Sequence, residues 1–81
     1  MRVAIAAFAG LRELLAGTAA DLELPAGASV ADAWSALERR QPALAPLAVS
    51  TRLARNGRLA ATTDLLSDGD ELALLPPVGG G

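Results

Sequence analysis

The chain closes with the stretch that decides its fold, Asp68-Gly69-Asp70-Glu71-Leu72-Ala73-Leu74-Leu75-Pro76-Pro77-Val78-Gly79-Gly80-Gly81. Its first three residues are typical of a tight turn, because aspartate side chains hydrogen-bond their own backbone at turn positions. Residues 71–75 indicate an apolar strand. The two prolines then fix φ near about −65° and favour extended geometry, so the backbone leaves the sheet. The stretch therefore predicts a last strand followed by a slender, flexible glycine tail.

Two strands and a short helix are predicted at the start of the chain. Residues 2–8 begin as a strand that is broken at Gly10. Residues 11–15 have helical spacing, with Gly17 as the expected C-cap. Residues 21–24 alternate polar and apolar side chains, which predicts a half-buried strand.

The clearest helix lies in the middle of the chain. Ser29-Val30-Ala31-Asp32 resembles a capping box in which aspartate replaces the usual glutamate, and Pro42 ends the helix. We expect residues 42–50 to form a connecting loop. Asn56-Gly57 then indicates a hairpin between two strands. Residues 62–66 are expected to form a short turn of helix.

The order of these segments predicts the topology. One main helix crosses a mixed sheet whose strands come from both ends of the chain, which indicates an α+β fold of the ubiquitin-like β-grasp type. A right-handed crossover sets the first and last strands side by side and parallel. We expect one β-grasp domain over residues 1–75 and an extended C-terminal tail over residues 76–81.

Composition excludes several classes of function. The chain has 81 residues and a net charge of −2, so it is one small domain without the basic surface of a nucleic-acid-binding protein. No apolar run approaches the roughly 20 residues that span a membrane, and no segment has signal-peptide character, so we expect a cytoplasmic protein. The sequence contains no cysteine, no histidine and no lysine. Disulfides and side-chain thiol chemistry are therefore excluded.

The polar side chains inside the domain do not predict a catalytic or metal site. Asp68 and Asp70 flank a turn glycine, and a turn role explains them better than a metal pair. Asp32 is expected to cap the main helix. Trp34 lies at helical spacing with apolar neighbours, which favours core packing over ligand stacking. We predict that this chain binds no metal and no cofactor.

The tail carries the remaining chemical group, the carboxylate of Gly81. Glycines lack a Cβ and can pass through a channel that is too narrow for other residues, so Gly79 and Gly80 are predicted to thread into a partner's active site. The apolar residues before them are predicted to dock on partner proteins: Leu74, Leu75, Pro76, Pro77 and Val78. Gly81 is then the reacting residue.

Short motifs along the whole chain resemble those of one family. They are Phe8-Ala9 with Leu11-Arg12-Glu13-Leu14, Ser29-Val30 with Asp32-Ala33, Ala54-Arg55-Asn56-Gly57, and finally Asp68-Gly69-Asp70-Glu71-Leu72-Ala73 with Pro76-Pro77-Val78 and Gly80-Gly81. This pattern is similar to that of the MoaD/ThiS sulfur carriers, and most of all to the small subunit of molybdopterin synthase. The family often has serine or threonine where this chain has Gly79.

The resemblance implies a protein co-substrate and not a catalyst. An adenylating enzyme of the ubiquitin-activating type would use ATP to adenylate Gly81, and a sulfur donor would convert the product into a thiocarboxylate. The chain would then donate sulfur to cyclic pyranopterin monophosphate in molybdenum cofactor biosynthesis. The implied partner is the large subunit of molybdopterin synthase, in a heterotetramer of two small and two large subunits. Neither a nucleic acid nor a membrane is implied.

Three alternatives stay open. The carrier could serve another sulfur pathway, such as those of thiamin thiazole, cysteine or a secondary metabolite. It could instead be a ubiquitin-like modifier that is conjugated to lysines. It could also be a plain β-grasp interaction module in which the tail is incidental. The Pro-Pro-Val run and the segment from Phe8 to Glu13 favour the molybdenum pathway.

Overall fold

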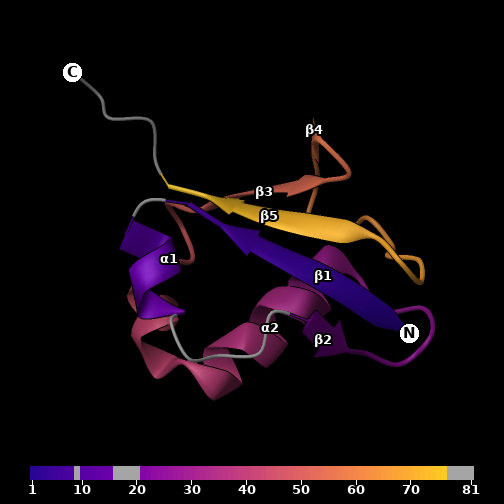
Figure 1. The fold of residues 1–81 in the computed structure, drawn as a ribbon, viewed down its shortest axis with the longest axis horizontal. Helices are drawn as coiled ribbons and strands as arrows, with labels where there is room; N and C mark the ends of the chain where they lie inside the picture. The colour runs from indigo at the N-terminus through magenta and orange to yellow at the C-terminus, as the bar shows by residue number, and fades with distance from the viewer. Residues whose placement is uncertain (9, 16–20, 77–81) are drawn as a thin grey trace.

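The computed structural model describes residues 1–8, 10–15 and 21–76, which form a mixed sheet with its helices on one side (Figure 1). The strands lie in the order β2-β1-β5-β3-β4, so the predicted β-grasp topology is confirmed. The elements are β1 (Arg2–Ala7), α1 (Gly10–Leu14), β2 (Asp21–Glu23), α2 (Val30–Arg40), the 3-10 helix η1 (Pro42–Leu47), β3 (Arg52–Arg55), β4 (Arg58–Leu59) and β5 (Glu71–Leu75).

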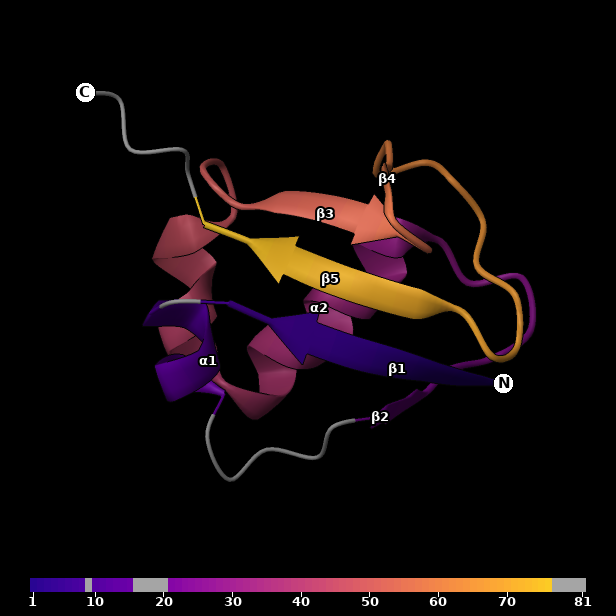
Figure 2. The ribbon, with the colours of Figure 1, turned by 45° about the horizontal axis from the view of Figure 1, so that its top comes forward.

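The first and last strands meet in the centre of the sheet. β1 and β5 pair in parallel, from Ala4 opposite Glu71 to Ala7 opposite Leu74, as a right-handed crossover predicts. β5 also pairs antiparallel with β3. Figure 2 shows β5 between these two neighbours along its whole length. The last strand is therefore held on both of its edges.

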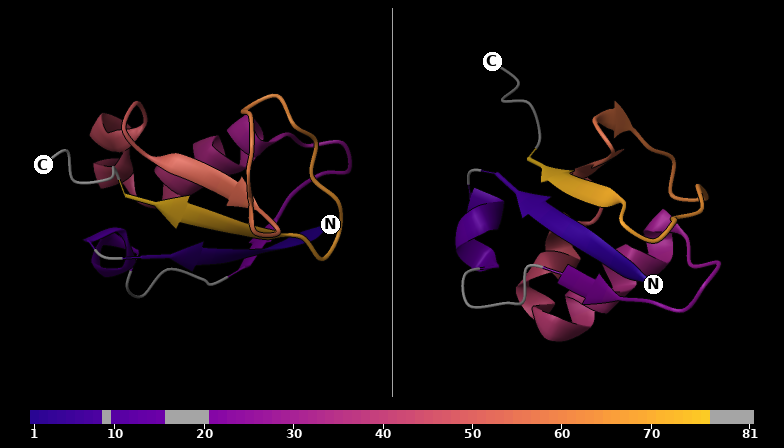
Figure 3. Two further views of the ribbon diagram at one scale, coloured as in Figure 1. Left: turned by 90° about the horizontal axis from the view of Figure 1, so that it is seen from above. Right: turned by 45° about the vertical axis from the view of Figure 1, so that its right-hand side comes forward.

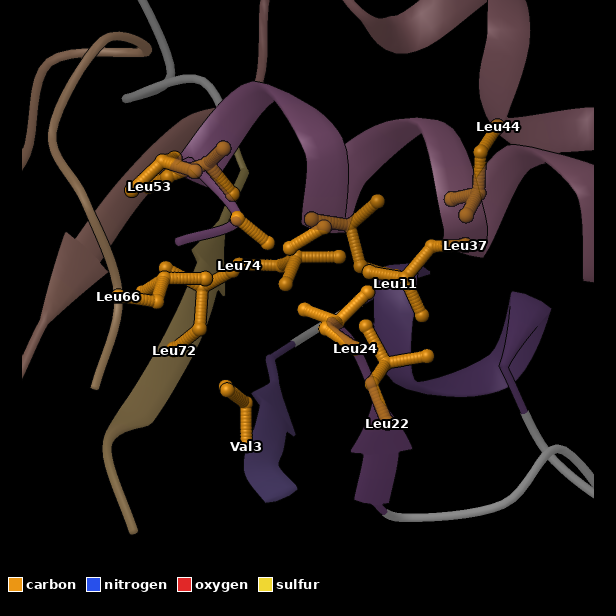
Figure 4. Packing of buried hydrophobic residues seen from close by; sticks show 13 residues of the cluster. Val3, Leu11, Leu22, Leu24, Leu37, Leu44, Leu53, Leu66, Leu72 and Leu74 are labelled. Atoms are coloured by element: carbon orange, nitrogen blue, oxygen red, sulfur yellow. The ribbon is translucent and has the colours of Figure 1, made fainter. Parts of the chain in front are cut away.

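The core lies between the sheet and α2 (Figure 4). Val3, Leu72 and Leu74 point from the sheet toward α2, which contributes Leu37. Leu44 of η1 is also fully buried. Each fully buried leucine contributes about 1.5–3 kcal/mol relative to an exposed one. Leucine packing therefore supplies most of the core of this domain.

The predicted capping box is present at the start of α2. The N–H of Asp32 donates to Ser29 Oγ (3.2 Å), and the N–H of Ser29 donates to Asp32 Oδ2 (2.9 Å). Each side chain thus satisfies a backbone donor that the helix itself leaves without a partner.

The loop before β5 supplies the rest of this cap. The N–H groups of Val30 and Ala31 donate to the carbonyl oxygens of Asp64 and Thr62, both at 2.9 Å. The helical turn predicted for residues 62–66 is therefore wrong. Two carbonyl groups of this segment bind the first turn of α2 and are not available for a helix of their own.

The predicted loop after α2 is helical in its first part. Gln41 Oε1 accepts a hydrogen bond from the N–H of Ala43 (3.3 Å), and Gln41 Nε2 donates to the carbonyl oxygen of Leu14 (2.8 Å). Proline at the first position presets φ for η1, and buried Leu44 anchors it to the core. The prediction of a loop at residues 42–47 was wrong for these reasons.

Asp70 ties the β3–β4 hairpin to the turn before β5. Its carboxylate accepts hydrogen bonds from Arg55 Nε (2.7 Å), Asn56 Nδ2 (2.9 Å) and the N–H of Ser67 (2.7 Å). Asn56 Oδ1 accepts from the N–H of Glu71 (2.9 Å). These bonds to the carboxylate, the one from Arg55 foremost, lower the pKa of Asp70 from 3.8 to about 2. The ionised form of Asp70 therefore stabilises the fold.

We predict that Asp70→Asn lowers the free energy of unfolding at neutral pH by on the order of 1–2 kcal/mol, a range that allows for solvent screening of Arg55. The folded pKa lies below the unfolded one. This stabilisation is therefore fully present above about pH 4 and is lost as the pH falls toward about 2. Urea unfolding of both proteins across this range measures the difference.

Glu71→Gln is the matched control for this prediction, because it removes an exposed carboxylate next to Asp70. It should change the free energy of unfolding by less than about 0.5 kcal/mol. If the difference between wild type and Asp70→Asn stays constant from neutral to acid pH, ionised Asp70 does not have this role.

Candidate functional site

β5 brings the chain to the edge of the domain at which the predicted tail begins. Leu75, its last residue, lies opposite Arg52 at the start of β3, and Leu74 lies opposite Ala7 at the end of β1. Leu75 and Pro76 are half-buried. We call the end of the sheet formed by Ala7, Arg52, Leu75 and Pro76 the tail exit (Figure 2). Because β5 is paired on both sides, the tail exit is a rigid base for the residues that follow.

The docking residues predicted from the sequence fall into three groups. Leu74 is fully buried and points toward α2, so the prediction that it is exposed for docking is wrong. Leu75 and Pro76 are accessible at the tail exit. The other predicted site residues lie outside the described residues: Pro77, Val78, Gly79, Gly80 and Gly81.

The sheet face opposite α2 carries small apolar side chains. Ala6, Ala73 and Ala54 lie side by side on β1, β5 and β3, and Leu59 of β4 continues the row. These residues alternate with core residues along each strand, so they face away from α2. Among the described residues no helix crosses this face (Figure 3). We call the surface formed by Ala6, Ala54, Leu59, Ala73 and Leu75 the open face. Ala54 and Ala73 are themselves buried (7% and 9% exposed), so its accessible apolar atoms come from Ala6, Leu59 and Leu75.

Larger apolar side chains lie beside these alanines. Leu59 is 65% exposed, and Phe8, which follows β1 directly, is 44% exposed. Accessible apolar side chains gathered next to the tail exit are typical of a protein–protein contact. Neither Phe8 nor Leu59 was predicted as a site residue. A signal was present, since β1, β3 and β5 have apolar residues on both faces, as do strands that are covered on both sides.

Several polar side chains of the domain are engaged in structural contacts. Asp68 lies in a turn as predicted, but its Oδ1 accepts a hydrogen bond from the N–H of Arg2 on β1 (2.7 Å) and not from the backbone of the turn. Trp34 packs against the core, and its Nε1 donates to Glu38 Oε1 (2.8 Å). The described part of the chain contains no cluster of acidic side chains that could hold a metal ion. None of its helices combines the length and the apolar character needed to cross a membrane.

The sequence and the fold match known proteins over nearly the whole chain. The sequence matches the ThiS family over residues 5–81. Small archaeal modifier protein 1 of Haloferax volcanii is 37% identical, over 91% of this chain and 94% of that protein. The crystal structure of the same Haloferax protein superimposes with a TM-score of 0.87, at 32% identity and with 100% of both chains covered.

A second solved structure is similar to the same degree. The putative molybdopterin converting factor subunit 1 of Pyrococcus furiosus superimposes with a TM-score of 0.87, at 28% identity, over 96% of this chain and 99% of that one. These matches include the strands of the open face and the tail exit. The chain therefore belongs to the ThiS/MoaD family of ubiquitin-like sulfur carriers and modifiers.

Proposed function

We propose that Gly81 of this chain is adenylated and then converted into a thiocarboxylate that donates sulfur. The observation that carries the proposal is the position of β5, a central strand that ends at the domain edge with Leu75, so that six residues follow it up to Gly81. The five residues after Pro76 span at most roughly 18 Å when extended. This length is sufficient to bring Gly81 into a recessed active site of a partner.

The proposed chemistry changes the bonds of one carbon atom. An oxygen of the Gly81 carboxylate attacks the α-phosphorus of ATP on an adenylating enzyme, and pyrophosphate leaves. A sulfur donor then supplies the equivalent of HS⁻, which adds to the carbonyl carbon and expels AMP. A C–S bond replaces a C–O bond, and the nucleotide is bound by the partner. Because the sequence has no cysteine, the sulfur has no side-chain thiol of this chain to move to.

We propose cyclic pyranopterin monophosphate as the sulfur acceptor, in the formation of molybdopterin. The likeness to the Pyrococcus converting-factor subunit supports this acceptor. In this proposal the chain is the non-catalytic small subunit, and the large subunit of molybdopterin synthase docks on the open face and the tail exit. The proposed assembly contains two small and two large subunits.

A second function is favoured by the likeness to the Haloferax modifier protein. As a modifier, the chain would be activated in the same way, but a lysine amine of a target protein would attack the Gly81 carbonyl and form an isopeptide bond. The chain has no lysine, so copies of it could not be joined to each other through such bonds. Isopeptide-linked targets in cells that carry Gly81 at the junction would favour this function over sulfur transfer.

Activation is expected to replace one terminal oxygen by sulfur and to raise the intact mass by about 16 Da. The wild-type protein is incubated with ATP, the adenylating enzyme of the same genome and a sulfide source, and its intact mass is measured. A chain that ends at Gly80 is the control and should gain no mass. Wild-type protein that never gains this increment would rule out the sulfur-carrier function.

Substitutions in the glycine run should separate activity from stability. We expect Gly80→Val and Gly81→Val to stay within about 0.5 kcal/mol of the wild-type free energy of unfolding, because the described core contains no residue beyond Leu74. Thiocarboxylate formation should fall on the order of a hundredfold, since it depends on the placement of one carbon atom. Gly79→Ser is the control and should retain near-normal activity. Equal tolerance at the three positions would mean that the glycines thread no channel.

Leu75→Glu should weaken binding to the large subunit about tenfold or more, because it places a carboxylate on the apolar open face. Leu75 is only half-buried, so the domain should still fold. Leu65→Glu is the matched control, since Leu65 is 61% exposed and pairs with Ser29 near the start of α2, far from the tail exit. Calorimetric titration measures binding, and circular dichroism measures folding. Equal weakening by the two substitutions would count against the open face as the docking surface.

A further inference from the structure

The charged residues of the domain are divided between its two ends. The end that carries the tail exit has four of the seven arginines, which we call the positive collar: Arg12 of α1, Arg39 and Arg40 of α2, and Arg52 of β3. Glu13 and Glu38 are the acidic residues near them. The other end, where β1 and β5 begin, carries most of the carboxylates: Asp21, Glu23, Asp64, Asp68, Asp70 and Glu71. A chain that is acidic overall thus has a positive end at the tail exit.

Contacts place one member of the positive collar, Arg52, at the tail exit and the other three at the same end of the domain. Arg52 lies directly opposite Leu75 in the β3–β5 pair. Gln41, the residue after Arg40, donates its Nε2 to the carbonyl oxygen of Leu14 (2.8 Å), so the end of α2 lies beside the end of α1. Figure 2 shows α1 and the start of β3 at the same end of the sheet as the end of β5.

Two of the three arginines outside the positive collar form ion pairs with carboxylates, whereas the third, Arg58, forms none within the described residues. At the far end, Arg55 forms an ion pair with Asp70 (2.7 Å) and Arg2 forms one with Glu23 (3.1 Å). Within the described residues, no arginine of the positive collar forms an ion pair with a carboxylate. All four are exposed. Their charge is therefore available to another molecule.

Helix stabilisation explains only part of the positive collar. Arg39 and Arg40 lie in the last turn of α2, where a cation interacts favourably with the helix dipole. Arg52 lies on a strand, and Arg12 lies in a helix too short for a comparable effect. The clustering of all four at one end thus needs a further explanation.

We propose that the positive collar steers the domain onto an acidic rim around the active-site entrance of the protein that adenylates Gly81. This inference rests on the proposed function. Because at most roughly 18 Å of chain follows Pro76, the partner's entrance must come close to the collar, within about one or two Debye lengths at physiological salt. The partner surface is then apolar against the open face and acidic around it. Such complementarity acts mainly on the association rate.

Two charge reversals on neighbouring strands test the collar with the same change in net charge. Arg52→Glu alters the positive collar, whereas Arg58→Glu alters an exposed arginine of β4 at the hairpin end. The assay is ATP–pyrophosphate exchange by the adenylating enzyme of the same genome. The quantity measured is the kcat/KM of that enzyme with this chain as the varied substrate. At an ionic strength of about 0.02 M we expect Arg52→Glu to lower kcat/KM by about fivefold to tenfold and Arg58→Glu by less than about twofold. At about 0.5 M the loss for Arg52→Glu should shrink to less than about twofold.

Equal losses for the two variants, or a loss that salt does not reduce, would overturn the proposed steering. A wild-type chain that supports no exchange at any salt concentration would instead refute adenylation of Gly81. A second probe therefore tests the collar without the enzyme. Titration of the ¹⁵N-labelled chain with polyglutamate at low salt should shift the amide signals around Arg12, Arg40 and Arg52 more than that of Arg58. If the amide signals of the whole domain shift equally, the proposed role of the positive collar is refuted, whatever the exchange assay shows.

Discussion

The parallel pairing of β1 with β5 is the interaction on which the rest of the structure depends. It joins the first and last strands, and because parallel strands cannot be joined by a hairpin, it requires the crossover that contains α2. It also sets β5 in the middle of the sheet, with β3 on its other edge. The tail exit is thus a product of the whole topology, and no fragment that lacks either end of the chain can form it.

Local signals explain how much of the fold could be predicted from the sequence. Alternating residues, the capping box at Ser29 and the Asn56-Gly57 turn are all readable within a few positions, and the elements they predict are present. The two wrong predictions concern segments whose hydrogen-bond partners are distant in sequence. The carbonyl groups of Thr62 and Asp64 bind the first turn of α2, and Gln41 reaches back to Leu14. No local pattern encodes such pairings.

The surface of the candidate site was only partly predictable from the sequence. The glycine run and the prolines predict the tail, and the chemistry of Gly81 stays a prediction because residues 77–81 lie outside the described residues. Leu74 and Leu75 are adjacent and chemically identical, and only the register against Leu53 and Arg52 decides which of them faces the core. The open face was not predicted, because alanine is compatible with both a buried and an exposed position. Asp70 was correctly placed in a turn, but its bond to Arg55, 15 positions away, is a tertiary contact.

The alanines on the open face limit how tightly a partner protein can bind this domain. Ala54 and Ala73 are buried, so a partner protein can reach only a few apolar side chains there, chiefly those of Leu59 and Leu75. In the proposed function, two different proteins bind this same surface one after the other. They cannot bind it at the same time. If the proposed function is correct, the chain must dissociate from the adenylating enzyme before it binds the protein that takes up the sulfur. The affinity for either protein is then limited, because each complex must dissociate at least as fast as the reaction turns over.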